Sequence, residues 1–196
     1  MIHDMPRAIR ERMRFLEELN ARQRQDEPVG FERLRQIPPV TGKFLALLAF
    51  AAPGGSWIEI GTSGGYSALW LSLAARERGA RLTTFEISEK KVGVARETFR
   101  LTGVDDVVEL VHGDALDHLK NCADVAFCFL DTEKDLYGPC YDAVVPRMAP
   151  GGILAADNVI SHEEVLGAWS GAVLGDPRLD ALIVPVGSGV LVARKV

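Results

Sequence analysis

The chain has 196 residues, of which 47% are hydrophobic and 25% charged, a composition typical of one globular domain. The formal net charge of -5 argues against a nucleic acid as the main partner. No apolar stretch is long enough to span a membrane, and the first residues are too charged for a signal peptide. Cys122, Cys128 and Cys140 show no paired spacing, so we expect reduced thiols and a cytoplasmic location.

The N-terminal region is predicted to form a helix at the periphery of the molecule. Apolar residues recur at near-helical spacing over residues 6–25, and a second helix is predicted over 41–52. Two stretches between them carry helix breakers, 26–30 (DEPVG) and 37–40 (IPPV). We expect residues 1–36 to form a helical segment that serves the substrate pocket or a homodimer contact, and residues 37–196 to form the main domain.

The rest of the chain alternates between predicted strands and helices. The predicted strands cover residues 57–60, 81–87, 107–111, 124–130 and 152–156. The predicted helices cover residues 65–78, 89–101, 114–120, 138–148 and 161–173. This order indicates an α/β fold, a mostly parallel sheet with helices on both faces. Two final apolar runs, ALIVPV and GVLVARK, are separated only by Gly-Ser, which predicts a two-residue hairpin and an antiparallel last strand.

The first predicted strand ends in a glycine-rich stretch, WIEIGTSGGYS (57–67). Glycines let the backbone approach a ligand closely, and the start of the following helix favours negative groups. The dinucleotide pattern G-x-G-x-x-G is not met, and no Gly-Lys-Ser/Thr follows, so this is not a nucleoside triphosphate loop of the common type. A purely structural turn is the alternative, but the density of glycines favours a ligand-binding loop.

Acidic residues follow the second and third predicted strands. Glu86 stands where a carboxylate accepts hydrogen bonds from ribose hydroxyls in open α/β sheets. Asp114 is suited equally to binding an adenine amino group and to capping the next helix. These residues indicate an adenosine ligand, and they leave a nicotinamide cofactor and S-adenosylmethionine both open.

Oxygen-bearing side chains follow the fourth and fifth predicted strands. Asp131 ends one strand, and Asp157 and Asn158 end the next. Each alone is better explained as a cap or turn; together, at the ends of neighbouring strands, they favour a hard divalent cation, Mg²⁺ first and Ca²⁺ or Mn²⁺ as alternatives. Lys134 is either a solvated loop residue or a general base that a nearby cation helps to deprotonate.

The combination of E-I-G-T-x-G-G-Y-S, F-E-I, D-x-x-K-x-x-Y and G-G-I-L-A-x-D-N resembles the cation-dependent O-methyltransferase family, which includes catechol and caffeoyl-CoA O-methyltransferases. The resemblance is collinear over residues 37–196. It implies a Rossmann-like, seven-stranded class I methyltransferase fold with S-adenosyl-L-methionine as cofactor. The N-terminal segment shows no recognisable substrate-contact pattern, and Glu133 replaces an Asp that is frequent in the family.

The resemblance also implies roles for individual residues. Asp131, Asp157 and Asn158 would bind the metal, and Lys134 and Asp131 would be the catalytic residues, with Lys134 as the base. The expected cofactor-binding residues are Glu59, Gly61, Ser63, Gly65, Tyr66, Ser67, Glu86, Ile87, Asp114, Ala115 and Asp131. The expected acceptor is a small aromatic molecule with two vicinal hydroxyls, with no nucleic acid or membrane partner.

Other interpretations remain at this point. A methyltransferase for another nucleophile is one, although the N/D-P-P-Y/F loop of amino-group methyltransferases is absent. A nicotinamide oxidoreductase is a second, against which the failed glycine pattern and the lack of a Tyr-x-x-x-Lys helix count. A non-catalytic cofactor-binding protein is a third, although such a protein has no need of the metal and base residues. Trp169 and His162 border the expected acceptor site, where Trp169 either stacks on the acceptor or packs in the core.

Overall fold

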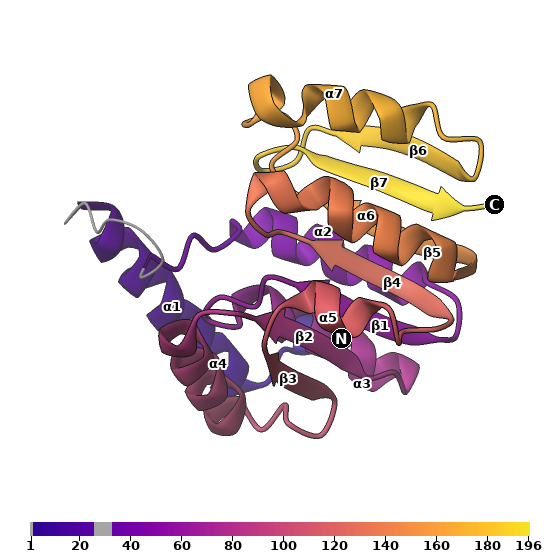
Figure 1. The fold of residues 1–196 in the computed structure, drawn as a ribbon. Helices are drawn as coiled ribbons and strands as arrows, with labels where there is room; N and C mark the ends of the chain where they lie inside the picture. Colours follow the sequence, from indigo (N-terminus) through magenta and orange to yellow (C-terminus); the bar gives the residue numbers. More distant parts are fainter. Residues whose placement is uncertain (1, 26–32) are drawn as a thin grey trace.

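The computed structural model describes residues 2–25 and 33–196, and the predicted break at 26–30 lies outside the described residues. A seven-stranded sheet runs through the molecule in the order β3-β2-β1-β4-β5-β7-β6 (Figure 1). The first five strands are parallel to one another, whereas β7 is antiparallel to both β5 and β6. The mostly parallel sheet and the antiparallel last strand predicted from the sequence are therefore confirmed.

The elements follow the predicted alternation. The strands are β1 (Ser56–Ile60), β2 (Leu82–Glu86), β3 (Val108–His112), β4 (Val125–Leu130), β5 (Met148–Ala156), β6 (Leu179–Val184) and β7 (Val190–Lys195). The α-helices are α1 (Arg7–Gln25), α2 (Pro39–Ala51), α3 (Tyr66–Arg78), α4 (Glu89–Thr102), α5 (Ala115–Leu119), α6 (Tyr137–Val144) and α7 (Glu163–Leu174). Short 3-10 helices cover Ile2–Asp4, Lys134–Leu136 and Val145–Arg147. Within the described ranges, no helix has the length and apolarity needed to cross a membrane.

Two apolar layers cover the two faces of the sheet. One contains buried residues of α1, α2, α3 and α4, and the other contains buried residues of α5, α6 and α7. All six residues of β4 are buried, as expected for a central strand covered on both sides. The sheet thus separates two cores, and its edges at the carboxyl ends of the strands are left for a ligand.

The C-terminal hairpin differs from its prediction. Five residues, 185–189, connect β6 to β7, instead of the predicted Gly-Ser turn. Val186 N donates to Val184 O at 2.8 Å, and Gly189 N donates to Val186 O at 2.9 Å, so the loop has its own hydrogen bonds. Gly187 and Gly189 both have positive φ, which glycine adopts without strain. The predicted strand ALIVPV is apolar up to Val186, so the sequence did not indicate that pairing of β6 with β7 ends at Val184.

The region before Asp157 also differs from its prediction. The predicted helix over 138–148 ends at Val144, where a 3-10 turn containing Pro146 follows. Proline lacks the N–H that a continuing helix requires. The strand β5 then begins at Met148, four residues before the predicted start at 152, and its register against β4 shifts between Val125 and Phe127.

The N-terminal helix α1 packs onto the same face as α3 and α4. Its residues Ile9, Met13 and Leu16 are buried in the core that those helices share. Arg12 is buried as well, and its Nε donates to Thr98 Oγ1 on α4 at 3.0 Å. This packing brings the C-terminal end of α1 to the side of the molecule where the parallel strands end (Figure 1).

Candidate active site

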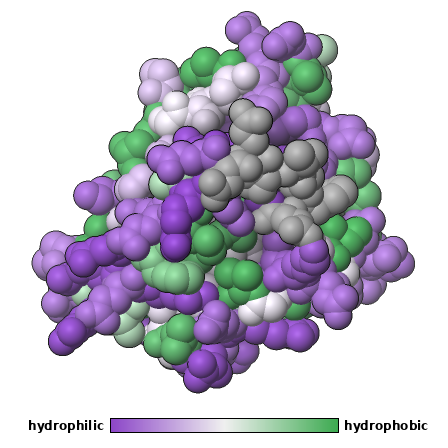
Figure 2. All heavy atoms as spheres, turned by 90° about the vertical axis from the view of Figure 1, so that its left-hand side faces the viewer, coloured by the Kyte–Doolittle hydropathy of each residue, from purple (hydrophilic) through white to green (hydrophobic). Residues whose placement is uncertain are grey.

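A cavity of about 530 Å³ opens at the carboxyl ends of the parallel strands, a volume typical of small-molecule sites. Hydrophilic residues cover much of this side of the molecule (Figure 2). Most of the residues predicted from the sequence line the cavity: Gly61, Ser63, Tyr66, Ser67, Glu86, Ile87, Asp114, Ala115, Asp131, Lys134, Asp157 and Asn158.

The glycine-rich loop after β1 is shaped by steric constraints. Gly61 has φ of 104°, and a Cβ at this position would overlap the carbonyl oxygen of Asp131. Only glycine therefore lets the loop pass so close to the end of β4. The loop backbone is fixed further because Gly61 N and Thr62 N both donate to Phe85 O, at 3.1 and 3.0 Å.

Glu86, at the end of β2, is buried and bonded to the backbone on two sides. Its Oε2 accepts from Ser63 N at 2.8 Å, and its Oε1 accepts from Ser88 N at 2.9 Å. A carboxylate has about four acceptor positions, so both oxygens retain capacity for a ligand hydroxyl. The arrangement fixes the carboxylate at the cavity wall, where it can accept hydrogen bonds from a sugar.

Glu59 and Gly65 were expected to bind the cofactor but do not line the cavity. Glu59 lies within β1, is fully buried and accepts from Thr84 Oγ1 at 2.5 Å. Burial raises its pKa to about 7. Gly65 has φ of 86°, and a Cβ there would lie 2.7 Å from a ring carbon of Phe99, so its lack of a side chain permits the close packing of α3 and α4.

Asp114 and Ala115 lie at the start of α5. Asp114 Oδ1 accepts from Leu116 N at 2.9 Å, so the carboxylate is the N-cap of this helix. Asp114 and Ala115 both line the cavity, as does the largely exposed Ile87. Asp114 therefore has the capping role considered for it. Its side chain also lies at the cavity wall, where the adenine of a cofactor could reach it.

Asp131, Asp157 and Asn158 come together because β4 and β5 are neighbouring parallel strands. Leu130 and Ala156 are paired in register, and the next residue of each strand is an aspartate. Asp157 is buried, and its Oδ2 accepts from Asn158 Nδ2 at 3.0 Å. Burial, followed by the charge of Asp131, raises the pKa of Asp157, and burial also raises the pKa of Asp131.

Lys134 lies among these oxygen atoms. Its Nζ donates to Asn158 Oδ1, to Thr132 O at 3.0 Å and to Tyr137 Oη at 3.1 Å, and lies 3.5 Å from Asp131 Oδ1. Tyr137 is buried and its hydroxyl donates in turn to Asp157 O at 3.0 Å. The Tyr137 hydroxyl therefore connects the lysine to the end of β5.

The donor set fits a hard divalent cation. Asp157 Oδ1 is buried and has no hydrogen-bond partner among the described residues, a costly state for a carboxylate oxygen. Asn158 has φ of 68°, a left-handed conformation that asparagine tolerates better than most residues. The set consists of two carboxylates and one amide. The described residues contain no group of three or more His, Cys, Asp or Glu side chains that could hold a metal, so the third ligand here would be the Asn158 amide.

Several cavity residues were not predicted from the sequence. Residues 33–38, which we call the strap, line the cavity together with Arg24 and Lys91. Leu34 N donates to Gln23 Oε1 at 3.1 Å, and Leu34 O accepts from Ser63 Oγ, so the strap connects α1 to the glycine-rich loop. Arg35 has φ of 48° and its Nη1 lies 3.1 Å from Glu133 Oε1. These contacts join distant parts of the chain and leave no local sequence signal.

Trp169 does not line the cavity, whereas His162 does. The Trp169 ring packs edge-on against Tyr137, with centroids 5.2 Å apart, and against Tyr141, with centroids 6.0 Å apart. Of the two interpretations of Trp169, the structure therefore favours core packing. His162 Nδ1 lies 2.9 Å from Ser161 Oγ at the rim of the cavity.

Comparisons with known proteins identify similar chains. A family model described as O-methyltransferase matches residues 10–196. A catechol O-methyltransferase of Niastella koreensis is 31% identical over 154 residues, which cover 75% of this chain and 69% of that protein. A catechol O-methyltransferase of Mycobacterium tuberculosis is 39% identical over 127 residues, which cover 64% of this chain and 57% of that protein.

Solved structures agree on the fold. The SAH-bound methyltransferase PaMTH1 of Podospora anserina superposes with a TM-score of 0.78 at 26% identity, over 98% of this chain and 89% of that one. The expected Rossmann-like, seven-stranded fold of class I methyltransferases is therefore confirmed.

Proposed function

Because the chain belongs to the O-methyltransferase family, we propose that it transfers the methyl group of S-adenosylmethionine to a hydroxyl of a small catechol-like acceptor, with the help of a divalent cation. The family and the enzyme class indicated by the sequence motifs are confirmed. The acceptor, the cation and the role of each residue belong to the proposal.

The observation that carries the proposal is the convergence of Asp131, Asp157, Asn158 and Lys134 at one end of the cavity. Asp157 Oδ1 is buried and without a partner among the described residues, so a bound cation would satisfy it. A divalent cation held by these oxygens would supply electrostatic stabilisation of the acceptor oxygen as it loses its proton. Mg²⁺ suits this oxygen donor set, with Ca²⁺ and Mn²⁺ as alternatives.

Lys134 is the proposed general base. Its Nζ is held by the Tyr137 hydroxyl and the Thr132 carbonyl, at 3.1 and 3.0 Å, and these contacts aim the amine at the cavity. In its neutral form the amine would accept the proton of the reacting hydroxyl. The acceptor oxygen would then form a bond to the methyl carbon while the methyl–sulfur bond breaks and S-adenosylhomocysteine leaves, and the fixed position of both reactants would supply much of the rate.

The glycine-rich loop and Glu86 are proposed to bind the cofactor. S-adenosylmethionine, when bound, supplies an electrophilic methyl group on a sulfonium. The loop at Gly61, Ser63 and Ser67 would bind the methionine part, and the Glu86 carboxylate, fixed by two backbone N–H groups, would accept from the ribose. Asp114 and Ala115 would flank the adenine. The whole arrangement uses residues 37–196, which we propose as the methyltransferase domain.

The test is methyl transfer from labelled S-adenosylmethionine to a panel of catechols, with Mg²⁺ and with EDTA. We expect transfer that EDTA stops and that added Mg²⁺ restores. Transfer unaffected by EDTA would reject the metal role and would favour a metal-independent methyltransferase. Cofactor binding without transfer to any acceptor would favour a non-catalytic binding protein. A homodimer and a cytoplasmic location remain predictions that light scattering and cell fractionation can test.

A further inference from the structure

Basic side chains line the cavity from the N-terminal side. Arg24 comes from the last turn of α1, and Arg33 and Arg35 come from the strap. They line the same cavity as the proposed metal and base residues. The chain as a whole has a net charge of -5, so these three arginines form a locally positive region on a negatively charged protein.

The three arginines differ in their partners. Arg35 forms an ion pair with Glu133, with Nη1 and Oε1 3.1 Å apart. Arg24 and Arg33 form no ion pair with any residue in the described part of the chain. Arg33 is half-buried, and its Nε is buried without a hydrogen-bond partner among the described residues. The Nε atom is closed off from the cavity, but the half-buried guanidinium lines the cavity without a carboxylate partner among the described residues, so a ligand that supplies an anionic acceptor to its remaining N–H groups would be favoured.

Four of the five acidic residues that line the cavity have other partners, and the fifth, Asp157, forms no ion pair with Arg33. Glu86 accepts from two backbone N–H groups, and Asp114 caps α5. Asp131 lies beside Lys134, and Glu133 is paired with Arg35. The acceptor for Arg33 must therefore come from another part of the chain or from a ligand.

The strap is fixed from both sides, which limits how far Arg33 can move. The next residue, Leu34, donates its backbone N–H to Gln23 on α1 and accepts from Ser63 in the glycine-rich loop. A backbone anchored in this way holds the guanidinium over the cavity at low entropic cost. A planar guanidinium binds carboxylate and phosphate groups through two parallel hydrogen bonds.

We propose that Arg33, together with Arg24, which lines the same cavity, binds an anionic group of the acceptor, a carboxylate or a phosphate. The inference rests on the proposed function, because it places the acceptor between these arginines and the metal and base residues. It adds a substrate class: the enzyme selects catechols that carry a negative charge on the side of the ring away from the reacting hydroxyl.

The experiment compares two acceptors of similar size, 3,4-dihydroxybenzoate and the neutral 3,4-dihydroxybenzyl alcohol. We expect a higher kcat/KM for the benzoate. Arg33→Ala should lower kcat/KM for the benzoate by about 10- to 100-fold, the loss typical of a hydrogen bond to a charged group. The value for the neutral alcohol should stay within about twofold, and Arg33→Lys should give an intermediate loss for the benzoate.

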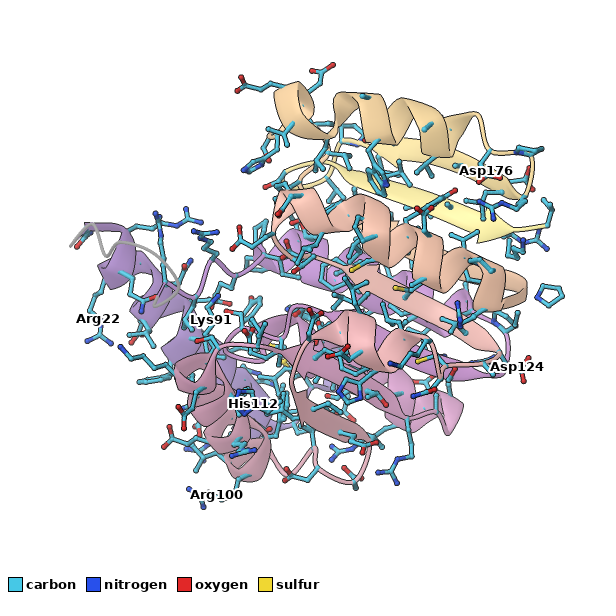
Figure 3. All side chains as sticks on the ribbon, in the orientation of Figure 1. Arg22, Lys91, Arg100, His112, Asp124 and Asp176 are labelled. Atoms are coloured by element: carbon cyan, nitrogen blue, oxygen red, sulfur yellow. The ribbon has the colours of Figure 1, made fainter. Side chains whose placement is uncertain are left out.

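Arg22→Ala is the matched control, because it also removes one arginine, from the same last turn of α1 that carries Arg24. Arg22 does not line the cavity and projects away from the body of the molecule (Figure 3). This variant should leave both acceptors unchanged. An equal loss for both acceptors in Arg33→Ala would indicate a structural role and would overturn the proposal, as would no loss for either. Unchanged affinity for S-adenosylhomocysteine shows that the variant is folded.

A binding measurement separates this inference from the proposed function. Calorimetry with the protein saturated by S-adenosylhomocysteine would titrate benzoate, phenyl phosphate and benzyl alcohol, whether or not any catechol is methylated. Binding of an anion that Arg33→Ala abolishes and Arg22→Ala retains would support the anion site even if methyl transfer fails. The tighter of benzoate and phenyl phosphate identifies the anionic group. No binding of either to the unmodified protein would overturn the proposal.

Discussion

The two ends of the cavity hold their carboxylates in opposite ways. At the glycine-rich loop, both oxygens of Glu86 accept backbone N–H groups. At the ends of β4 and β5, burial and then the charge of Asp131 raise the pKa of Asp157, and Asp157 Oδ1 has no hydrogen-bond partner among the described residues. The first end is prepared for a ligand by the backbone. The second end requires positive charge, which Lys134 supplies in part.

This contrast predicts that variants will separate into two groups. Changes at the end that holds Asp157 and Lys134 should lower kcat with little effect on cofactor affinity. Changes at the end that holds Glu86 should weaken cofactor binding with a smaller effect on kcat. A variant that violates this division would show that the two ends do not act independently.

The largest effect is expected for Asp157→Ala. It removes the buried carboxylate of the proposed metal site, and kcat should fall by about 1,000-fold, a loss typical of removing a main electrostatic contact. S-adenosylmethionine affinity, measured by calorimetry, should change by no more than about threefold. Asp142→Ala, which removes an exposed aspartate of α6, is the control and should retain activity. Mg²⁺-dependent activity equal to that of the unmodified enzyme would rule out Asp157 as a metal ligand.

Lys134→Ala should have the next largest effect. Without the amine, kcat should fall by about 100-fold across the pH range, as expected for loss of a general base. Tyr137→Phe removes one hydroxyl that accepts from Lys134 and donates to Asp157 O, so a loss of a few-fold to about 10-fold is expected. Single-turnover kinetics with bound cofactor would measure the methyl-transfer step directly. If Lys134→Ala turned over normally at every pH, the base would have to be another group.

For Glu86→Gln we expect a smaller effect than for Lys134→Ala, and one that falls on cofactor binding. The glutamine amide has only one oxygen, so it can accept from only one of the two backbone N–H groups. The N–H of Ser63 or of Ser88 would then face the NH₂ group and lose its acceptor. Cofactor affinity should fall about 10-fold, the equivalent of one lost hydrogen bond to a charged group. Glu89→Gln, on the exposed surface of α4, should leave the affinity unchanged. A loss of kcat at saturating cofactor, with unchanged affinity, would contradict the assignment.

Periodicity and turn residues were enough to predict most of the fold, because strands and helices are encoded locally. The glycine-rich turn after β1 is an example, since Gly61 and Gly65 have a positive φ that favours glycine. The loop between β6 and β7 and the early start of β5 at Met148 were missed. Both depend on how far pairing with a neighbouring strand extends, which local sequence does not specify.

The site was predicted unevenly for the same reason. Residues that follow directly from a strand end, such as Asp131 and Asp157, could be located because parallel strands end at one edge. Arg33 and Lys91 could not, because they reach the cavity through packing between distant segments. In Figure 3, Lys91 lies on α4 on the side where the strands end, a position visible only once α4 is folded against the sheet.

The hydrogen bonds of Leu34 on its two sides connect the strap to the proposed cofactor site. Its carbonyl is bound by Ser63, whose own N–H is bound by Glu86, so the strap and the proposed ribose carboxylate share one short chain of contacts. A ligand that shifts Ser63 must also shift the segment that carries Arg33. Cofactor binding at Ser63 would then be linked to anion binding at Arg33, and such linkage is reciprocal: each ligand would change the affinity for the other by the same factor.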